Sequence, residues 1–260
     1  MIRLLRKLTV EQWAAIDRDY RDRELPDSRV MWILLTITLC LVLPRYFGNP
    51  SFIDSIPAAK KLFATWPHPT LWPKLYWAGF KFINYLLVPI LAIKFLLKES
   101  VLDHGLRPTR EGKVWLLYLA MFLVVVPMAY GASFTDSFIR TYPKYRYAGA
   151  SWEQLIAWEF GYGFQFFALE FFFRGFLLFA LARYIGSAAI FVMVVPYAMI
   201  HFSKPLAETL GSVLAGMALG TIALRTRSIY GGVAVHCGVA WAMDLFAMLR
   251  KGQIQHLFEE

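Results

Sequence analysis

Long apolar segments recur along the chain and constrain its fold more than any other feature. An α-helix needs about 20 predominantly apolar residues to cross a bilayer. Segments close to that length are predicted at 30–47, 72–97, 114–132, 163–183, 187–202, 205–224 and 229–249. Charged residues make up only 17% of the 260 residues, compared with roughly 25% in soluble domains. The sequence therefore predicts an all-α fold, a polytopic transmembrane helix bundle of about seven spans with six to eight as the range.

The polar residues divide the chain into four regions. Residues 1–29 carry seven Lys or Arg and predict a cytoplasmic juxtamembrane amphipathic segment. Next come N-terminal transmembrane helices and loops (30–150), core helices (151–250) and a C-terminal tail (251–260). With the N-terminus inside, the inner segments hold 14 Lys or Arg and the outer segments 8. The positive-inside rule then predicts a multi-pass protein of a bacterial-type inner or plasma membrane, with its N-terminus cytoplasmic.

The net charge of +9 does not indicate a nucleic-acid-binding protein. Lys and Arg gather at the ends of the predicted spans, where lipid headgroups explain them. No groove-reading motif accompanies them. Cys40 and Cys237 both lie in apolar helices, so no structural disulfide is expected.

Local signals mark several helix ends and one helix contact. Ser151 with Gln154 three residues later predicts a capping box at the start of a long helix. Ser203 and Pro205 predict the cap and the first turn of another. Gly216 and Gly220 form a GxxxG pair, which favours close packing of two helices.

Four ionisable residues stand out inside the apolar segments. Glu170 and Arg174 are four residues apart, so they share a helix face and can pair. His201 ends the segment FVMVVPYAMIHF, and His236 lies within IYGGVAVHCGVAWAM. A charged residue at the bilayer centre costs about 2.5–3.5 kcal/mol, so such residues face a protein interior or a water-filled cavity. Two histidines and a carboxylate are also a frequent set for activating water.

Two further acidic residues can support this set. Glu208 falls in the first turn of the helix after His201, where the helix dipole favours a carboxylate, and Lys204 is either its partner or a headgroup anchor. Asp244 lies deep in the last span, eight residues after His236. Counting about 1.5 Å per residue places Glu170, His201, Glu208 and Asp244 toward the outer leaflet and His236 deeper. This pattern predicts an outward-opening cavity with His236 at its floor.

Three short motifs carry a resemblance to a known family. LEFFFRG (169–175), YAMIH (197–201) and HCGVA (236–240) resemble, in order and spacing, the motifs of the CPBP family. This family comprises type II CAAX prenyl proteases, bacteriocin-processing proteins and related Abi proteins, which are intramembrane proteases. The resemblance covers about residues 165–245.

The resemblance implies a role for each matched position. Glu170 matches the second glutamate of the family's first motif and Arg174 its arginine, while His201 and His236 match the two histidines. In the family a glutamate and the first histidine are thought to activate water, and the second histidine helps to stabilise the oxyanion. Two positions depart from the pattern. Leu169 replaces the first glutamate, which is usually given the general-base role, and Ala240 stands where an Asn often sits.

The sequence therefore predicts an intramembrane endopeptidase that hydrolyses a membrane-anchored or exported peptide. Glu170, His201 and His236 are the predicted catalytic residues, with Glu170 or Glu208 as the base. Arg174, Glu208 and Asp244 are predicted to support them. The expected partners are this peptide and membrane lipid, and no cofactor is expected.

Two alternatives stay open at this point. One is a non-catalytic relative that acts as an immunity, binding or scaffolding protein, which the two departures favour. The other is a zinc-dependent intramembrane protease with Glu170, His201 and His236 as ligands, because two histidines and a carboxylate suit zinc.

Overall fold

The computed structural model describes residues 6–20 and 27–259, and no strand occurs within these ranges. Within the described residues, six helices are long and apolar enough to span a membrane: Ser28–Tyr46, Trp72–Leu97, Gly112–Ala132, Trp152–Ile185, Leu206–Thr226 and Tyr230–Arg250. The prediction of an all-α polytopic helix bundle is confirmed. The chain is an integral, multi-pass membrane protein.

One predicted span is shorter than expected. The apolar stretch predicted at 187–202 forms α11 (Ala188–Met199), which has only 12 residues. About 20 residues are needed to cross the hydrocarbon core, so α11 is not a full-length span. The physical reason is that the chain already leaves the helix at Ile200, where a turn carries it toward Pro205.

The chain divides into two compact units, each assembled from three separate segments. The first unit contains Met1–Thr38, Leu86–Val114 and Glu170–Gly232, and the second contains Leu39–Tyr85, Trp115–Leu169 and Val233–Glu260. They are described in turn.

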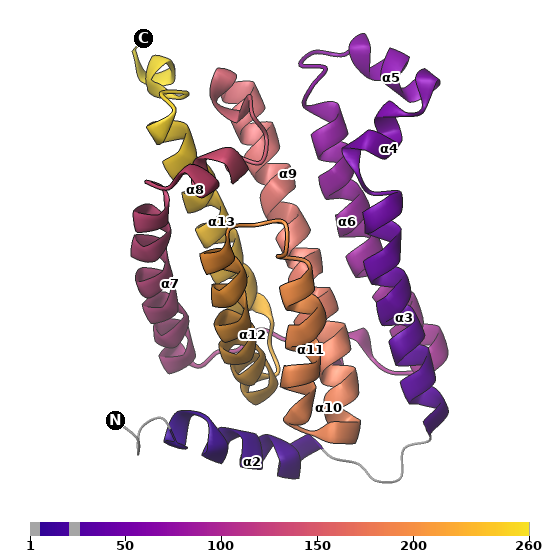
Figure 1. Cartoon of the computed structure of the whole chain (residues 1–260). Helices are drawn as coiled ribbons and strands as arrows, with labels where there is room; N and C mark the ends of the chain where they lie inside the picture. Colours follow the sequence, from indigo (N-terminus) through magenta and orange to yellow (C-terminus); the bar gives the residue numbers. More distant parts are fainter. Residues whose placement is uncertain (1–5, 21–26, 260) are drawn as a thin grey trace. The chain divides into compact units, whose positions relative to one another are not determined.

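The first unit is built around short helices packed on a longer one. Its complete elements are α2 (Val10–Tyr20), η1 (Ala92–Leu97), η2 (Val101–Asp103), η4 (Phe171–Leu178), α10 (Phe179–Ile185), α11 and α12 (Leu206–Thr226). It also takes the first part of α3 (Asp27–Tyr46). Helix α11 packs along α12 (Figure 1). A Cβ on Gly216 would lie 2.9 Å from Val194, and one on Gly220 3.1 Å from Met193. The close packing predicted from GxxxG is therefore confirmed.

Helix α2 lies crosswise against the ends of α10 and α12 in Figure 1. The indole of Trp13 donates to the Thr221 hydroxyl at 3.2 Å, and the Tyr20 hydroxyl donates to the Leu224 carbonyl at 2.9 Å. Ile16 is completely buried. The predicted amphipathic segment thus contains a helix that is docked on the unit, while residues 21–26 lie outside the described residues.

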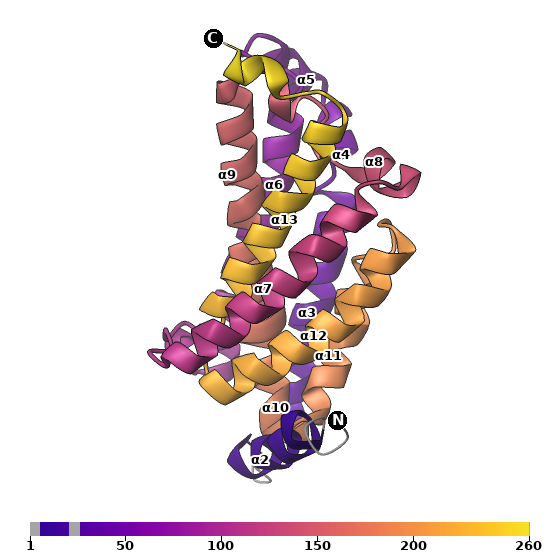
Figure 2. The same cartoon turned by 90° about the vertical axis from the view of Figure 1, so that its left-hand side faces the viewer.

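Besides the rest of α3, the second unit holds all or most of each remaining element. These are α4 (Pro50–Asp54), α5 (Pro57–Ala64), α6 (Trp72–Leu91), α7 (Gly112–Ala132), α8 (Asp136–Thr141), η3 (Ala148–Ala150), α9 (Trp152–Glu170), α13 (Tyr230–Arg250) and η5 (Gln255–Phe258). Helix α7 crosses α13 obliquely (Figure 2), and a Cβ on Gly238 of α13 would lie 2.7 Å from Phe122 of α7. A Cβ on Gly163 of α9 would lie 2.5 Å from the Trp241 ring. Glycine therefore lets α13 approach both neighbours closely.

The predicted helix caps have mixed outcomes. The Ser151 hydroxyl accepts a hydrogen bond from the backbone N–H of Gln154 at 3.3 Å, so the predicted start of the long helix is confirmed. The prediction that Ser203 caps the next helix is wrong. Pro205 occupies the N-cap, and Ser203 lies two residues before it. Cys40 and Cys237 are both buried, and neither forms a disulfide within the described residues.

Candidate functional site

Glu170 and Arg174 form a buried ion pair in the first unit. Glu170 ends α9, and Arg174 lies in η4, the π-helical stretch that continues the same helix. The guanidinium donates to Glu170 Oε1 at 2.9 Å, and the two side chains are 0% and 1% exposed. The predicted pairing is confirmed. Charges this deeply buried are stable only when they are paired, because desolvation of each alone is costly.

A wide helical turn and Gly175 let the segment around His104 pack against the helix that carries this pair. A π-helix is rare, and short π-helical stretches occur frequently at functional sites. Within η4, the Gly175 carbonyl accepts a hydrogen bond from His104 Nδ1 at 2.9 Å. A Cβ on Gly175 would lie only 2.6 Å from the His104 carbonyl oxygen. Glycine is thus required where residues 103–105 cross the helix that carries Arg174.

His104 is held in turn by Glu99, which also pairs with two arginines. His104 Nε2 lies 3.0 Å from Glu99 Oε2, and Arg29 donates to Oε1 at 3.1 Å. Arg183 pairs with the same oxygen. Burial alone would raise the pKa of Glu99, but the His104 hydrogen bond and the Arg183 and Arg29 charges outweigh it and lower that pKa. Each ring nitrogen of His104 thus has a hydrogen-bond partner, which fixes the orientation of the ring.

This second polar cluster was missed by sequence reasoning. Its members come from three separate parts of the sequence, at Arg29, at Glu99 and His104, and at Arg183. The available signal was a glutamate and a histidine shortly after the 72–97 span, which is commonplace at the end of a span. The cluster fixes the segment that packs on Gly175, and so it supports the position of η4.

Replacing Gly175 tests how tightly this region is packed. We expect Gly175→Ala to lower the free energy of unfolding by about 1–3 kcal/mol, because the clashing oxygen belongs to the backbone and cannot rotate away. Gly211 of α12 is a matched control in the same unit, since a Cβ there meets nothing within 4 Å. Gly211→Ala should be neutral, or stabilising by about 0.8–1.0 kcal/mol through helix propensity. Equal unfolding temperatures for both variants in detergent would contradict the close contact.

Tyr197 connects the Glu170–Arg174 pair to His201. The Arg174 guanidinium carbon lies 4.1 Å from the centre of the Tyr197 ring. The Tyr197 and His201 rings have their centroids 4.8 Å apart. A guanidinium over an aromatic face is attracted by the ring quadrupole, so this contact is favourable. The first two motifs are therefore brought together in one unit, through an aromatic ring.

The orientation of His201 is set by its own helix end. His201 follows the last turn of α11, is 5% exposed, and its Nδ1 lies 2.7 Å from the Tyr197 carbonyl oxygen. A carbonyl only accepts, so Nδ1 carries the proton. In the neutral ring this leaves the lone pair on Nε2, which is the nitrogen that can accept a proton from water. The hydroxyl of Thr209 donates to the His201 carbonyl at 2.8 Å and fixes the backbone there.

Glu208 has a partner of its own. It lies in the first turn of α12, as predicted, and its carboxylate is 2.6 Å from Lys204 Nζ. Both side chains are 18% exposed. Lys204 is therefore the charge partner of Glu208.

His236 and Asp244 belong to the second unit and are described within it. The His236 ring packs against Phe166 of α9, with centroids 4.4 Å apart. Asp244 is completely buried, and it accepts hydrogen bonds from the Trp158 indole at 2.8 Å and from the Lys144 amide at 3.1 Å. The eight residues between His236 and Asp244 correspond to about 12 Å along the helix. Any effect of Asp244 on His236 is therefore indirect.

The segment that carries all three motifs also matches a family model. Residues 151–242 match the model described as Type II CAAX prenyl endopeptidase Rce1-like. This segment is similar to the Rce1-like family. No curated protein and no solved structure matches the chain. The predicted resemblance to the CAAX protease group of the CPBP family is thereby confirmed for these residues.

Two residues of the Rce1-like segment carry no polar chemistry. Leu169 and Ala240 are each 5% exposed, so both are buried as apolar residues. Leu169 immediately precedes Glu170 on α9. The predicted general base therefore has to be another carboxylate, and the prediction of Glu170 or Glu208 is untested by this observation.

No three His, Cys, Asp or Glu side chains converge closely enough to hold a metal ion within the part of the chain that the structure describes. Glu170 Oε1 accepts from Arg174, so this oxygen is already bound to a cation. Zinc dependence and the outward-opening cavity both stay predictions.

Proposed function

We propose that this protein is an intramembrane endopeptidase that cleaves a membrane-anchored or exported peptide. The observation that carries the proposal is the grouping of Glu170, Arg174 and His201 around Tyr197, inside a segment of the Rce1-like family. A buried carboxylate and a histidine whose Nε2 holds its lone pair form a suitable set for activating water. The N-terminus is proposed to be cytoplasmic.

The proposed reaction is hydrolysis of one peptide bond. A carboxylate, Glu170 or Glu208, acts with His201 Nε2 and takes a proton from water, whose oxygen attacks the peptide carbonyl carbon. The C–N bond then breaks, and the proton passes to the leaving amine. His236 is proposed to stabilise the oxyanion of the tetrahedral intermediate. The products are a carboxylate and an amine, and no cofactor takes part.

The arginine has a distinct part in this proposal. A guanidinium beside a buried carboxylate favours the ionised form of that carboxylate. Arg174 would thus keep Glu170 in the form that accepts a proton, while the cation reduces its basicity. Glu208 is likewise paired with a cation, Lys204, with greater exposure to solvent. The two carboxylates are therefore chemically similar candidates, and only substitution separates them.

Glu170→Gln and Glu208→Gln, made separately, test which carboxylate is the base. The purified protein in nanodiscs would be given a library of membrane-anchored peptides, and cleavage would be followed by mass spectrometry. We expect one variant to lose cleavage by about 10²–10⁴-fold, the contribution typical of a general base. The other should keep most of the activity. Full activity in both variants would rule out this assignment.

A second candidate function is favoured by the apolar character of Leu169 and Ala240. A non-catalytic relative would bind a peptide or lipid and act as an immunity or scaffolding protein. It predicts no cleavage of any anchored peptide by the folded protein, and a cellular phenotype that survives His201→Ala and His236→Ala. A zinc-dependent protease instead predicts that a chelator abolishes cleavage and that zinc restores it.

A further inference from the structure

The second unit contains an open cleft with a strongly basic lining. Its volume is about 370 Å³, and it lies between the start of α6 and the segment 140–147. Four of its lining side chains are cationic: Lys74, Arg140, Lys144 and Arg146. No carboxylate lines it. Among the described residues, neither Lys74, Arg140 nor Arg146 takes part in an ion pair. The cleft therefore presents an excess of positive charge.

The pKa of a fifth basic side chain, close to the cleft, is affected by this excess of positive charge. Lys251 follows α13 and donates a hydrogen bond from Nζ to the Tyr142 carbonyl at 2.7 Å. Burial and the charge of Arg146 lower the pKa of Lys251, against the opposing attraction of Asp244. Asp244 is a single nearby carboxylate facing several cations, and cations that repel each other are further stabilised when another anion binds.

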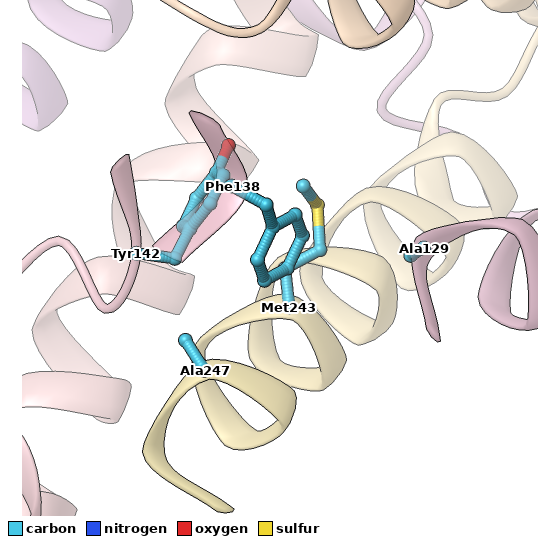
Figure 3. Close-up of a cluster of buried hydrophobic side chains, with 5 residues drawn as sticks. All are labelled: Ala129, Phe138, Tyr142, Met243 and Ala247. Atoms are coloured by element: carbon cyan, nitrogen blue, oxygen red, sulfur yellow. The ribbon is translucent and has the colours of Figure 1, made fainter. Parts of the chain in front are cut away.

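The segment that carries three of these cations is held firmly by the helices around it. Asp244 accepts the Lys144 amide, as described above. Phe138 and Tyr142 pack with Met243 and Ala247 of α13, and Figure 3 shows these side chains gathered in one cluster. The Tyr145 hydroxyl donates to Gln154 Oε1 at 2.6 Å. The cationic side chains thus project from a preorganised backbone, which lowers the entropy lost on binding a ligand.

The position of the cleft along the helices indicates its depth in a bilayer. Lys74 is in the first turn of α6, and Lys251 directly follows the end of α13. Trp72 begins α6, and Trp152 begins α9. Tryptophan is enriched at both membrane–water interfaces, and the ends of spanning helices lie there. The anionic group available at this depth is the phosphate of a phospholipid headgroup.

We propose that this cleft binds the phosphate of an anionic phospholipid headgroup. Arginine presents a planar fork of donors that matches two phosphate oxygens, and lysine adds a compact charge. The zwitterionic headgroup of phosphatidylcholine also carries a quaternary ammonium group, which the surrounding cations repel. Anionic headgroups are therefore preferred over phosphatidylcholine. The site is independent of the peptidase activity, because it uses none of the residues assigned to that chemistry.

The test compares two charge-matched double variants of the full-length protein. Arg140→Gln/Arg146→Gln removes two exposed cations from the cleft. Lys60→Gln/Lys61→Gln removes two exposed cations of α5, in the same unit but outside the cleft. The unfolding temperature in detergent would be measured while adding phosphatidylglycerol, phosphatidylcholine or inorganic pyrophosphate at constant ionic strength. Lys144→Gln provides a second cleft variant if the double variant does not fold.

We expect phosphatidylglycerol to raise the unfolding temperature of the wild type and of the Lys60/Lys61 variant. The cleft variants should need roughly tenfold more lipid for the same shift, since each interfacial cation contributes a comparable attraction. An equal response of cleft and control variants would overturn the proposal, because it would mean attraction to the surface as a whole. An equal effect of phosphatidylcholine, or a full effect of pyrophosphate alone, would overturn the preference for an anionic lipid.

Discussion

His201→Ala is expected to lower kcat/KM for an anchored peptide by about 10²–10⁴-fold. The reason lies in the hydrogen bond from Nδ1 to the Tyr197 carbonyl, which leaves Nε2 to accept a proton from water. Alanine removes both nitrogens, and with them the base partner of the carboxylate. Cleavage would be measured on a membrane-anchored peptide with the purified protein in nanodiscs.

A second substitution separates chemistry from structure at this position. In His201→Asn the amide can still donate to the Tyr197 carbonyl, but it offers no basic nitrogen. This variant should fold like the wild type and should be as inactive as His201→Ala. His256, an exposed histidine near the C-terminus, provides the control, and His256→Ala should retain full activity. Cleavage that survives in both His201 variants would contradict the proposed role of the histidine.

Arg174→Met is expected to destabilise the protein by about 3–5 kcal/mol, the effect of removing one partner from a buried ion pair. Methionine fills much of the same volume but leaves the Glu170 carboxylate, 0% exposed, without its cation. It also removes the guanidinium from the Tyr197 ring. At about 2–4 °C per kcal/mol for a protein of this size, the unfolding temperature should fall by roughly 6–20 °C.

The double variant Glu170→Gln/Arg174→Met should recover most of this stability, because no uncompensated charge remains. Arg107 offers a matched control in the same unit, since it pairs with Asp103 at the same spacing but with side chains 65% and 61% exposed. Arg107→Met should cost less than about 1 kcal/mol, as exposed pairs contribute little. If Arg174→Met lowers the free energy of unfolding no more than Arg107→Met does, burial does not make the Glu170–Arg174 pair important for stability.

Much of the fold was predictable because it follows from local regularities of the chain. The apolar stretch at 72–97 and the helix Trp72–Leu97 coincide. Membrane helices are readable in this way because the bilayer demands about 20 apolar residues in a row. The same logic applies to Glu170 and Arg174, whose pairing follows from helical spacing. The length of α11 was predicted less well, because the residues just before the turn at Ile200 are apolar like the helix itself and do not mark where it ends.

The contacts of Asp244 show where such reasoning stops. Its depth in the last span correctly indicated that it needs a partner, and spacing suggested His236 on the same helix. The partners observed are Trp158 and the amide of Lys144, which lie far away in the sequence. The basic cleft depends on the same anchoring, so neither was visible in the residue pattern. Hydropathy predicts whether a side chain is buried, but it does not predict which residues the side chain contacts.

The sequence by itself determined the class of the protein, the positions of most membrane helices, the Glu170–Arg174 pair and the family motifs. These depend on residue type and on spacing along one helix, which backbone geometry fixes. Only the tertiary structure decided that Tyr197 joins this pair to His201, that Glu99 and His104 support η4, and that four cations line one cleft. Such contacts join segments far apart in the chain, and they follow from how side chains of particular shape pack together.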